Sequence, residues 1–241
     1  MDDIADVTDY SEDSSALNQN EKLEREFDFE EFCKNIKKCV FKEALSTDDV
    51  ELKYYLLAYE QLYDFFLLLG GAFQFVASDV KNKIEILNKF QNEELTKNEK
   101  LIYFSTVKSM VNHEIESNLL KDSKYVSGSR TLLRLHRGLD FIRKFLKAIY
   151  DAENNEKLGV IARETYDKTL AEYHSWIIKT SARVAMQFLP TRAELLNKIS
   201  KNNEDKLNQM LNLLPEAFDS MNQVFDRVQK LYEEKKILDL S

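Results

Sequence analysis

Three arginines fall on one stripe of a predicted helix, a pattern suited to binding an anion. Arg130, Arg134 and Arg137 are spaced at i, i+4 and i+7, so their side chains would point to the same side of a helix. Cations at this spacing repel one another by roughly a few tenths of a kcal/mol per pair unless an anion or carboxylates compensate. Guanidinium N–H groups match the geometry of phosphate oxygens. The stripe is therefore either a phosphate-binding face or a solvated basic face.

A carboxylate and an ammonium group are paired on another predicted helix, over residues 72–90. Asp79 and Lys83 are four residues apart, which places their side chains next to each other. Asp79 falls among apolar positions such as Val76 and Ile86, where a carboxylate that loses its water needs a partner. The two residues are either an internal ion pair at the edge of the core or part of a polar site.

A histidine lies on the apolar face of a third predicted helix, over residues 159–189. His174 is flanked on that face by Leu170, Ile177 and Ile178. It is either a core residue with satisfied ring nitrogens or a hydrogen-bonding group in a site. No second histidine lies at the spacing of metal ligands, so we expect no metal site.

Motifs of common catalytic sites are absent from the sequence. It contains no G-x-S-x-G, no P-loop, no H-E-x-x-H and no Gly-rich phosphate loop. Nothing in it indicates an activated nucleophile. We therefore expect a protein that is not an enzyme and that requires no cofactor.

The elements that must position these residues are helices. Glycine and proline supply 5 and 2 of the 241 residues, against about 17 and 12 at average usage, which disfavours turn-rich β architectures. Apolar residues recur at helical spacing almost continuously from Phe27 onward. The pattern predicts one all-α domain over residues 27–241 with about eight helices, at residues 29–44, 48–69, 72–90, 99–120, 129–151, 159–189, 191–201 and 206–236.

Charge is concentrated at the amino-terminal end of the sequence. Residues 1–26 contain nine acidic and two basic residues and no sustained hydrophobic periodicity, which predicts an acidic disordered tail.

The net charge of −8 argues against nucleic acid as a partner. No stretch has the pattern of a signal peptide or the length of a membrane span. We expect a monomer that acts in the cytosol.

Four features occur together in a recognisable order. A Gly70–Gly71 break precedes Asp79 and Lys83, and the segment RTLLRLHRGL follows at residues 130–139. The segment YHSW comes next at residues 173–176, and Pro190 lies fourteen residues beyond its tryptophan. This combination resembles the glycolipid transfer protein superfamily, and within it the branch that transfers ceramide-1-phosphate.

The resemblance implies both a fold and a site. The fold would be a two-layer helical sandwich with a lipid cavity between the layers. Asp79 would hold the amide N–H and hydroxyl of a sphingoid base, and His174 would donate to the amide carbonyl. The resemblance assigns the head-group phosphate to three cations, Lys83, Arg130 and Arg134. It assigns contact with the membrane surface to Trp176 and Arg137.

Two positions separate the branches of this superfamily. In the glycolipid branch the position of Arg134 holds a tryptophan and that of Lys83 an asparagine. This sequence has a cation at both positions, which favours a phosphate head group over a sugar. The three cations and Asp79 sum to +2, which nearly cancels the charge of about −1.5 to −2 on a phosphomonoester. We therefore expect non-vesicular transfer of ceramide-1-phosphate between membranes, by transient peripheral contact. The alternatives are transfer of a glycosphingolipid, or a lipid-gated sensor or interaction protein that uses the same site.

Overall fold

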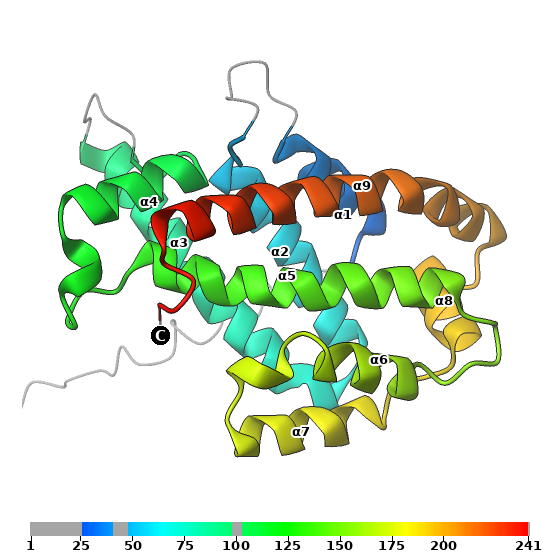
Figure 1. Cartoon of the computed structure of the whole chain (residues 1–241). Coiled ribbons are helices and arrows are strands. Elements are labelled where there is room, and N and C mark those ends of the chain that lie inside the picture. The colour runs from blue at the N-terminus through cyan, green and yellow to red at the C-terminus, as the bar shows by residue number, and fades with distance from the viewer. Residues whose placement is uncertain (1–25, 41–47, 98–102, 241) are drawn as a thin grey trace, which may run out of the picture.

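The computed structural model describes residues 26–40, 48–97 and 103–240. Residues 1–25 of the predicted acidic tail lie outside the described residues. The described part of the chain forms nine α-helices and three short 3-10 turns (Figure 1). The helices are α1 (Phe29–Lys38), α2 (Leu52–Leu68), α3 (Gln74–Lys97), α4 (Val107–Glu116), α5 (Gly128–Asp151), α6 (Leu158–Asp167), α7 (Trp176–Met186), α8 (Arg192–Ser200) and α9 (Glu204–Lys235). The turns are η1 (Gly71–Phe73), η2 (Leu119–Lys121) and η3 (Ala171–Tyr173).

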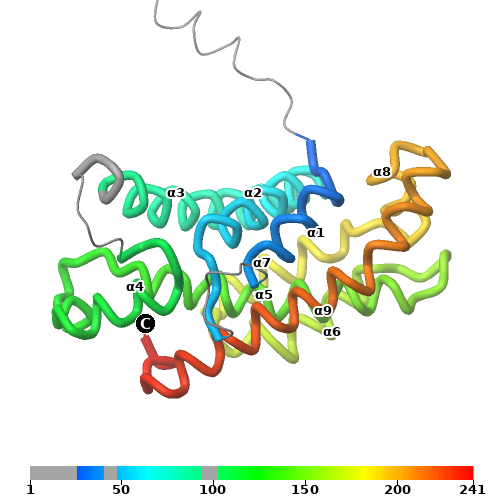
Figure 2. Tube along the Cα trace, turned by 90° about the horizontal axis from the view of Figure 1, so that it is seen from above, coloured from blue at the N-terminus to red at the C-terminus, as the bar shows by residue number. Residues whose placement is uncertain are grey.

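The helices pack as two layers, as expected. Seen from above, α2 and α3 form one row, and α5 and α9 run beside it (Figure 2). Helix α1 packs on both α2 and α9, and α3 packs on α5, so these pairs join the layers. Helices α6 and α7 close the lower edge of the molecule in the view of Figure 1. No helix of the described residues combines the length and apolarity that crossing a bilayer requires.

Helix α5 has the two faces that the sequence predicts. Leu132, Leu135, Leu139 and Ile142 point into the core and are buried. The arginine stripe occupies the other side, where Arg134 is exposed. Because the apolar residues fix how α5 is rotated, they also fix the direction in which the arginines point.

A buried glutamate on α4 holds the beginning of α5. The Glu114 side chain is fully buried and accepts hydrogen bonds from Ser127 Oγ at 2.7 Å, Gly128 N at 2.7 Å and Ser129 N at 3.0 Å. Ser127 Oγ in turn accepts from the backbone N–H of Arg130 at 3.1 Å. A carboxylate is well placed here because the amino end of a helix carries unpaired N–H groups and a partial positive charge.

The predicted continuous helix over residues 159–189 is wrong. The chain leaves the helix after Asp167, passes through η3, and begins α7 at Trp176. Ser175 caps the new helix by accepting from Ile178 N at 3.5 Å, and the preceding His174 has an extended backbone. Serine side chains compete in this way with continuous helical hydrogen bonding. His174 therefore lies in a link between helices and not on a helix face.

Helices α6 and α7 form a close hairpin after this break. Gly159 stands at the start of α6, where an added Cβ would lie 2.5 Å from the carbonyl oxygen of Met186 at the end of α7. Arg183, in the last turn of α7, pairs through Nη2 with Asp167 Oδ1 at the end of α6, at 2.7 Å. These two contacts hold α7 against α6, and the link that carries His174 joins the two helices.

Candidate functional site

Asp79 and Lys83 form the predicted ion pair on α3, near the Gly70–Gly71 turn. Lys83 Nζ donates to Asp79 Oδ1 and lies 3.4 Å from the Asp79 carbonyl oxygen. The Lys83 side chain is only 12% exposed, whereas that of Asp79 is 66% exposed. Of the two alternatives for this pair, the internal ion pair is therefore wrong, because the Asp79 carboxylate is not withdrawn from water. Asp79 remains accessible to a ligand, and the buried stem of Lys83 directs the ammonium toward it.

His174 approaches this pair from the link before α7. Its ring is half-buried, and Nδ1 is 2.8 Å from the hydroxyl of Tyr166 on α6. Loss of water lowers the pKa of His174, while the Asp79 carboxylate opposes this shift and the Lys83 ammonium adds to it. His174 is therefore within electrostatic reach of both members of the ion pair.

Arg137, the last arginine of the stripe on α5, lies beside the same link. The Arg137 guanidinium stacks 4.0 Å from the ring centre of Tyr173, directly before His174, and donates to the carbonyl oxygen of Leu238 at 2.7 Å. Arg137 therefore fastens the link and the carboxyl-terminal segment to α5. Arg134 is exposed one turn earlier, and within the described ranges its guanidinium makes no hydrogen bond or ion pair. It is the cation of this stripe that is free to meet a ligand.

The Arg130 side chain contacts the η2 turn and not the link that carries His174. It is half-buried, and its Nη2 donates to the carbonyl oxygen of Leu120 in η2. A guanidinium has five N–H donors, so this bond leaves others for an anion. The structure thus brings Asp79, Lys83 and His174 within electrostatic reach of one another, and it places Arg134 one helical turn from Arg137, which stacks on Tyr173. Arg130 begins the same stripe one turn farther along α5.

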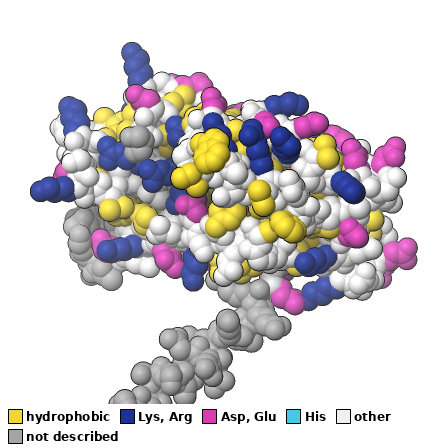
Figure 3. All heavy atoms as spheres, turned by 90° about the horizontal axis from the view of Figure 1, so that it is seen from below, with side chains coloured by type: hydrophobic (Ala, Val, Ile, Leu, Met, Phe, Trp, Pro, Cys, Tyr) yellow, Lys and Arg dark blue, Asp and Glu magenta, His cyan; other side chains and the backbone are white. Residues whose placement is uncertain are grey.

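Next to these polar groups, α7 presents an apolar face to solvent. The α7 face consists of Trp176, Ile177 and Val184 on the helix and Phe188 in the turn directly after it, which are exposed by 77%, 70%, 49% and 68%. Figure 3 looks onto this side of the molecule and shows hydrophobic side chains beside a group of lysines and arginines. Ile177, Val184 and Phe188 are spaced at i, i+7 and i+11, which places them on one side of a helix. The sequence therefore shows this apolar stripe once a helix is known to start at Trp176. A large exposed apolar patch marks a surface for a membrane or a protein partner.

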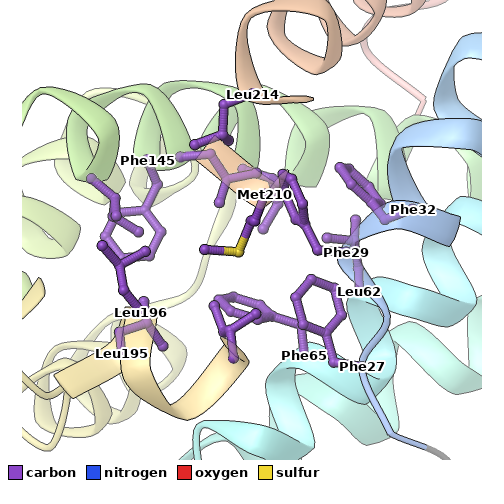
Figure 4. A pocket seen from close by; sticks show the side chains of 14 residues that line it. Phe27, Phe29, Phe32, Leu62, Phe65, Phe145, Leu195, Leu196, Met210 and Leu214 are labelled. Atoms are coloured by element: carbon purple, nitrogen blue, oxygen red, sulfur yellow. The ribbon is translucent and has the colours of Figure 1, made fainter. Parts of the chain in front are cut away.

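A wholly apolar cavity lies between the two layers, in the half of the molecule formed by α1, α8 and the start of α9 (Figure 4). Its volume is about 40 Å³. Phe145 lines it from α5, roughly 16 Å along the helix from Arg134 at 1.5 Å per residue. The lining residues cannot be recognised from the sequence, because cavity walls and ordinary core have the same composition. They are Phe27, Phe29, Phe32, Leu62, Phe65, Ile142, Phe145, Leu146, Ile149, Leu195, Leu196, Ile199, Met210 and Leu214.

Among the described residues, no group of three or more histidine, cysteine, aspartate or glutamate side chains is arranged to hold a metal ion. The chemistry that the site offers is hydrogen bonding and charge. Asp79 accepts, and Lys83 supplies positive charge beside it. The arrangement can therefore bind an anionic group next to a group that donates hydrogen bonds.

The chain is similar to proteins of one family. The family profile described as glycolipid transfer protein matches residues 50–201. A ceramide-1-phosphate transfer protein of Rattus norvegicus is 32% identical over 223 residues, covering 90% of this chain and 98% of that protein. The crystal structure of mouse ceramide-1-phosphate transfer protein in its apo form has a TM-score of 0.78 at 30% identity, covering 89% of this chain and all of the other. The human protein in complex with 12:0 ceramide-1-phosphate has a TM-score of 0.74 at 30% identity, with the same coverage.

Proposed function

The chain belongs to the glycolipid transfer protein family, and from this premise we propose that it transfers ceramide-1-phosphate between membranes. In this proposal the protein acts as a monomer in the cytosol and contacts membranes only transiently. The lipid head group binds at Asp79, Lys83, Arg130, Arg134 and His174, and its two chains enter the apolar interior.

The observation that carries the proposal is the accessible Asp79–Lys83 pair on α3, together with the exposed Arg134 on the neighbouring helix α5. Lys83, Arg130 and Arg134 bring three positive charges, and Asp79 brings one negative charge. The net +2 is close to the opposite of the charge on a phosphomonoester, about −1.5 to −2 near pH 7. A neutral sugar would desolvate the same cations without supplying a counter-charge, which is costly. The charges therefore favour a phosphate head group over a sugar.

The apolar interior explains how such a protein can act as a carrier. A sphingolipid with two chains has roughly 30 methylenes, which disfavours its free passage through water by about 24 kcal/mol. Moving the chains from a bilayer into a protein interior is nearly neutral, because both surroundings are apolar. The cavity of about 40 Å³ is close to the ~30 Å³ share of one liquid water, so its side chains must move apart to admit a chain.

The experiment that tests this function measures transfer of fluorescent ceramide-1-phosphate from donor to acceptor vesicles. Catalytic amounts of protein should move the phosphorylated lipid and leave glucosylceramide in place. Equal transfer of both lipids would contradict the argument from charge. Slow, stoichiometric retention of ceramide-1-phosphate would instead indicate a lipid-gated sensor that uses the same site.

We further propose that the α7 face is the surface that meets the membrane. Replacing Trp176 and Ile177 together by serine should weaken binding to vesicles and slow transfer by at least about tenfold, since burying one large apolar side chain contributes roughly 1.5–3 kcal/mol. Both side chains are mostly exposed, so the melting temperature should not change.

Vesicle co-sedimentation and the transfer assay check this prediction. Val126→Ser is the control, because Val126 is 57% exposed in the segment before α5, outside the α7 face. If the control weakened vesicle binding as much as the double substitution, the effect would reflect general hydrophobicity and not this surface.

A further inference from the structure

Tyr166 is a buried phenol whose hydroxyl reaches the candidate site. The residue is only 2% exposed, and its ring packs edge-on against Phe141 at a centroid distance of 6.5 Å. Its hydroxyl oxygen is 2.8 Å from Nδ1 of His174. Because α6 packs on α5 and α7, the ring is held from both sides and its hydroxyl has little freedom to turn away.

The direction of this hydrogen bond follows from what each group needs. A buried O–H that lacks an acceptor costs roughly 1–3 kcal/mol. Within the described residues the Tyr166 hydroxyl has no acceptor other than His174 Nδ1. Burial raises the pKa of Tyr166, so the phenol keeps its proton. Burial lowers the pKa of His174, so the ring is neutral at neutral pH and one nitrogen can accept. Tyr166 therefore donates, and Nδ1 accepts.

We propose that Tyr166 is a positioning residue that holds His174 in the tautomer with the proton on Nε2. A neutral imidazole carries one proton, so an accepting Nδ1 leaves Nε2 as the donor. The site then presents one acceptor, the Asp79 carboxylate, and one donor, His174 Nε2–H. This pair is complementary to an amide, which offers an N–H and a carbonyl oxygen. The inference rests on the proposed function for the identity of that amide, which belongs to ceramide-1-phosphate.

The test replaces Tyr166 by phenylalanine, which removes only the hydroxyl oxygen. Long-range ¹H–¹⁵N correlation spectra of the lipid-free protein distinguish a protonated ring nitrogen from an unprotonated one. We expect an unprotonated Nδ1 and a protonated Nε2 in the wild type, and a measurable share of the opposite tautomer in Tyr166→Phe. A wild-type spectrum with the proton on Nδ1 would overturn the proposal.

Transfer of fluorescent ceramide-1-phosphate gives the second measurement. Tyr166→Phe should slow transfer about tenfold, the upper range for one hydrogen bond. Tyr150→Phe is the matched control, because it removes the same atom from an exposed tyrosine near the carboxyl end of α5 that makes no hydrogen bond with His174. In a His174→Ala background, Tyr166→Phe should cause no further loss, since groups that act through one another are not additive.

A further loss in that background would show that the Tyr166 hydroxyl acts independently of His174 and would contradict the proposal. The spectra require no lipid, so they test the role of Tyr166 independently of whether the protein transfers ceramide-1-phosphate. If wild-type protein failed to transfer ceramide-1-phosphate but showed the expected tautomer and its loss in Tyr166→Phe, the proposed function would fail while the role of Tyr166 stood.

Discussion

Replacing Arg134 by leucine should abolish transfer of ceramide-1-phosphate and leave the fold intact. Arg134 is exposed and makes no hydrogen bond or ion pair within the described residues, so its loss removes no internal contact. A guanidinium binds phosphate through two parallel charged hydrogen bonds, each contributing roughly 1.5–3 kcal/mol. We therefore expect the transfer rate to fall by at least about a hundredfold, with an unchanged thermal melt.

Two companion variants separate geometry from net charge. Arg134→Lys keeps the charge but loses the paired donors, so it should restore only part of the activity. Lys147→Leu removes a charge from the same helix, roughly 20 Å farther along α5 at 1.5 Å per residue, and should transfer normally. Wild-type transfer by Arg134→Leu would remove this residue from the site, and an equal loss in Lys147→Leu would point to overall charge.

Glu114→Ala should cause the largest loss of stability. Its buried carboxylate accepts from Ser127, Gly128 and Ser129, so removing it leaves three buried donors without an acceptor. At about 1–3 kcal/mol per unsatisfied group, with some relaxation, the free energy of unfolding should fall by about 4 kcal/mol. For a chain of this length that corresponds to a melting temperature lower by roughly 10 °C.

Urea denaturation and thermal melts followed by circular dichroism check this result. Glu116→Ala is the matched control, since Glu116 is the exposed last residue of the same helix. Glu114→Gln keeps one carbonyl oxygen and should lose less stability than Glu114→Ala. If Glu114→Ala and Glu116→Ala melted at the same temperature, the role assigned to the buried carboxylate would be wrong.

The sequence predicted well what depends on local spacing. The two-faced pattern of α5 determined both its buried leucines and its arginine stripe, because one helical period sets all of these directions. The spacing of Asp79 and Lys83 predicted their ion pair for the same reason. These relations hold within one helix and do not require knowledge of its neighbours.

Relations between elements could not be obtained from spacing. The approach of His174 to Asp79 and Lys83 depends on how the α6–α7 hairpin and α3 both pack on α5, and only the family resemblance indicated it. Apolar periodicity assigned Ile177 and Ile178 to the face around a buried His174, yet they are exposed by 70% and 43%. A pattern of hydrophobic residues cannot by itself distinguish a face that meets the core from one that meets a membrane.

In α5, the residues that stabilise the helix differ from the residue proposed to bind the head group, and this has a consequence for how the protein can evolve. The buried contacts of Glu114 and the leucines secure the helix, whereas Arg134 stands at an exposed position that contributes nothing to folding. Most substitutions at such a position leave stability above the threshold that selection enforces. If Arg134 meets the head group as proposed, substitutions at this position alter lipid binding without requiring compensating changes in the interior.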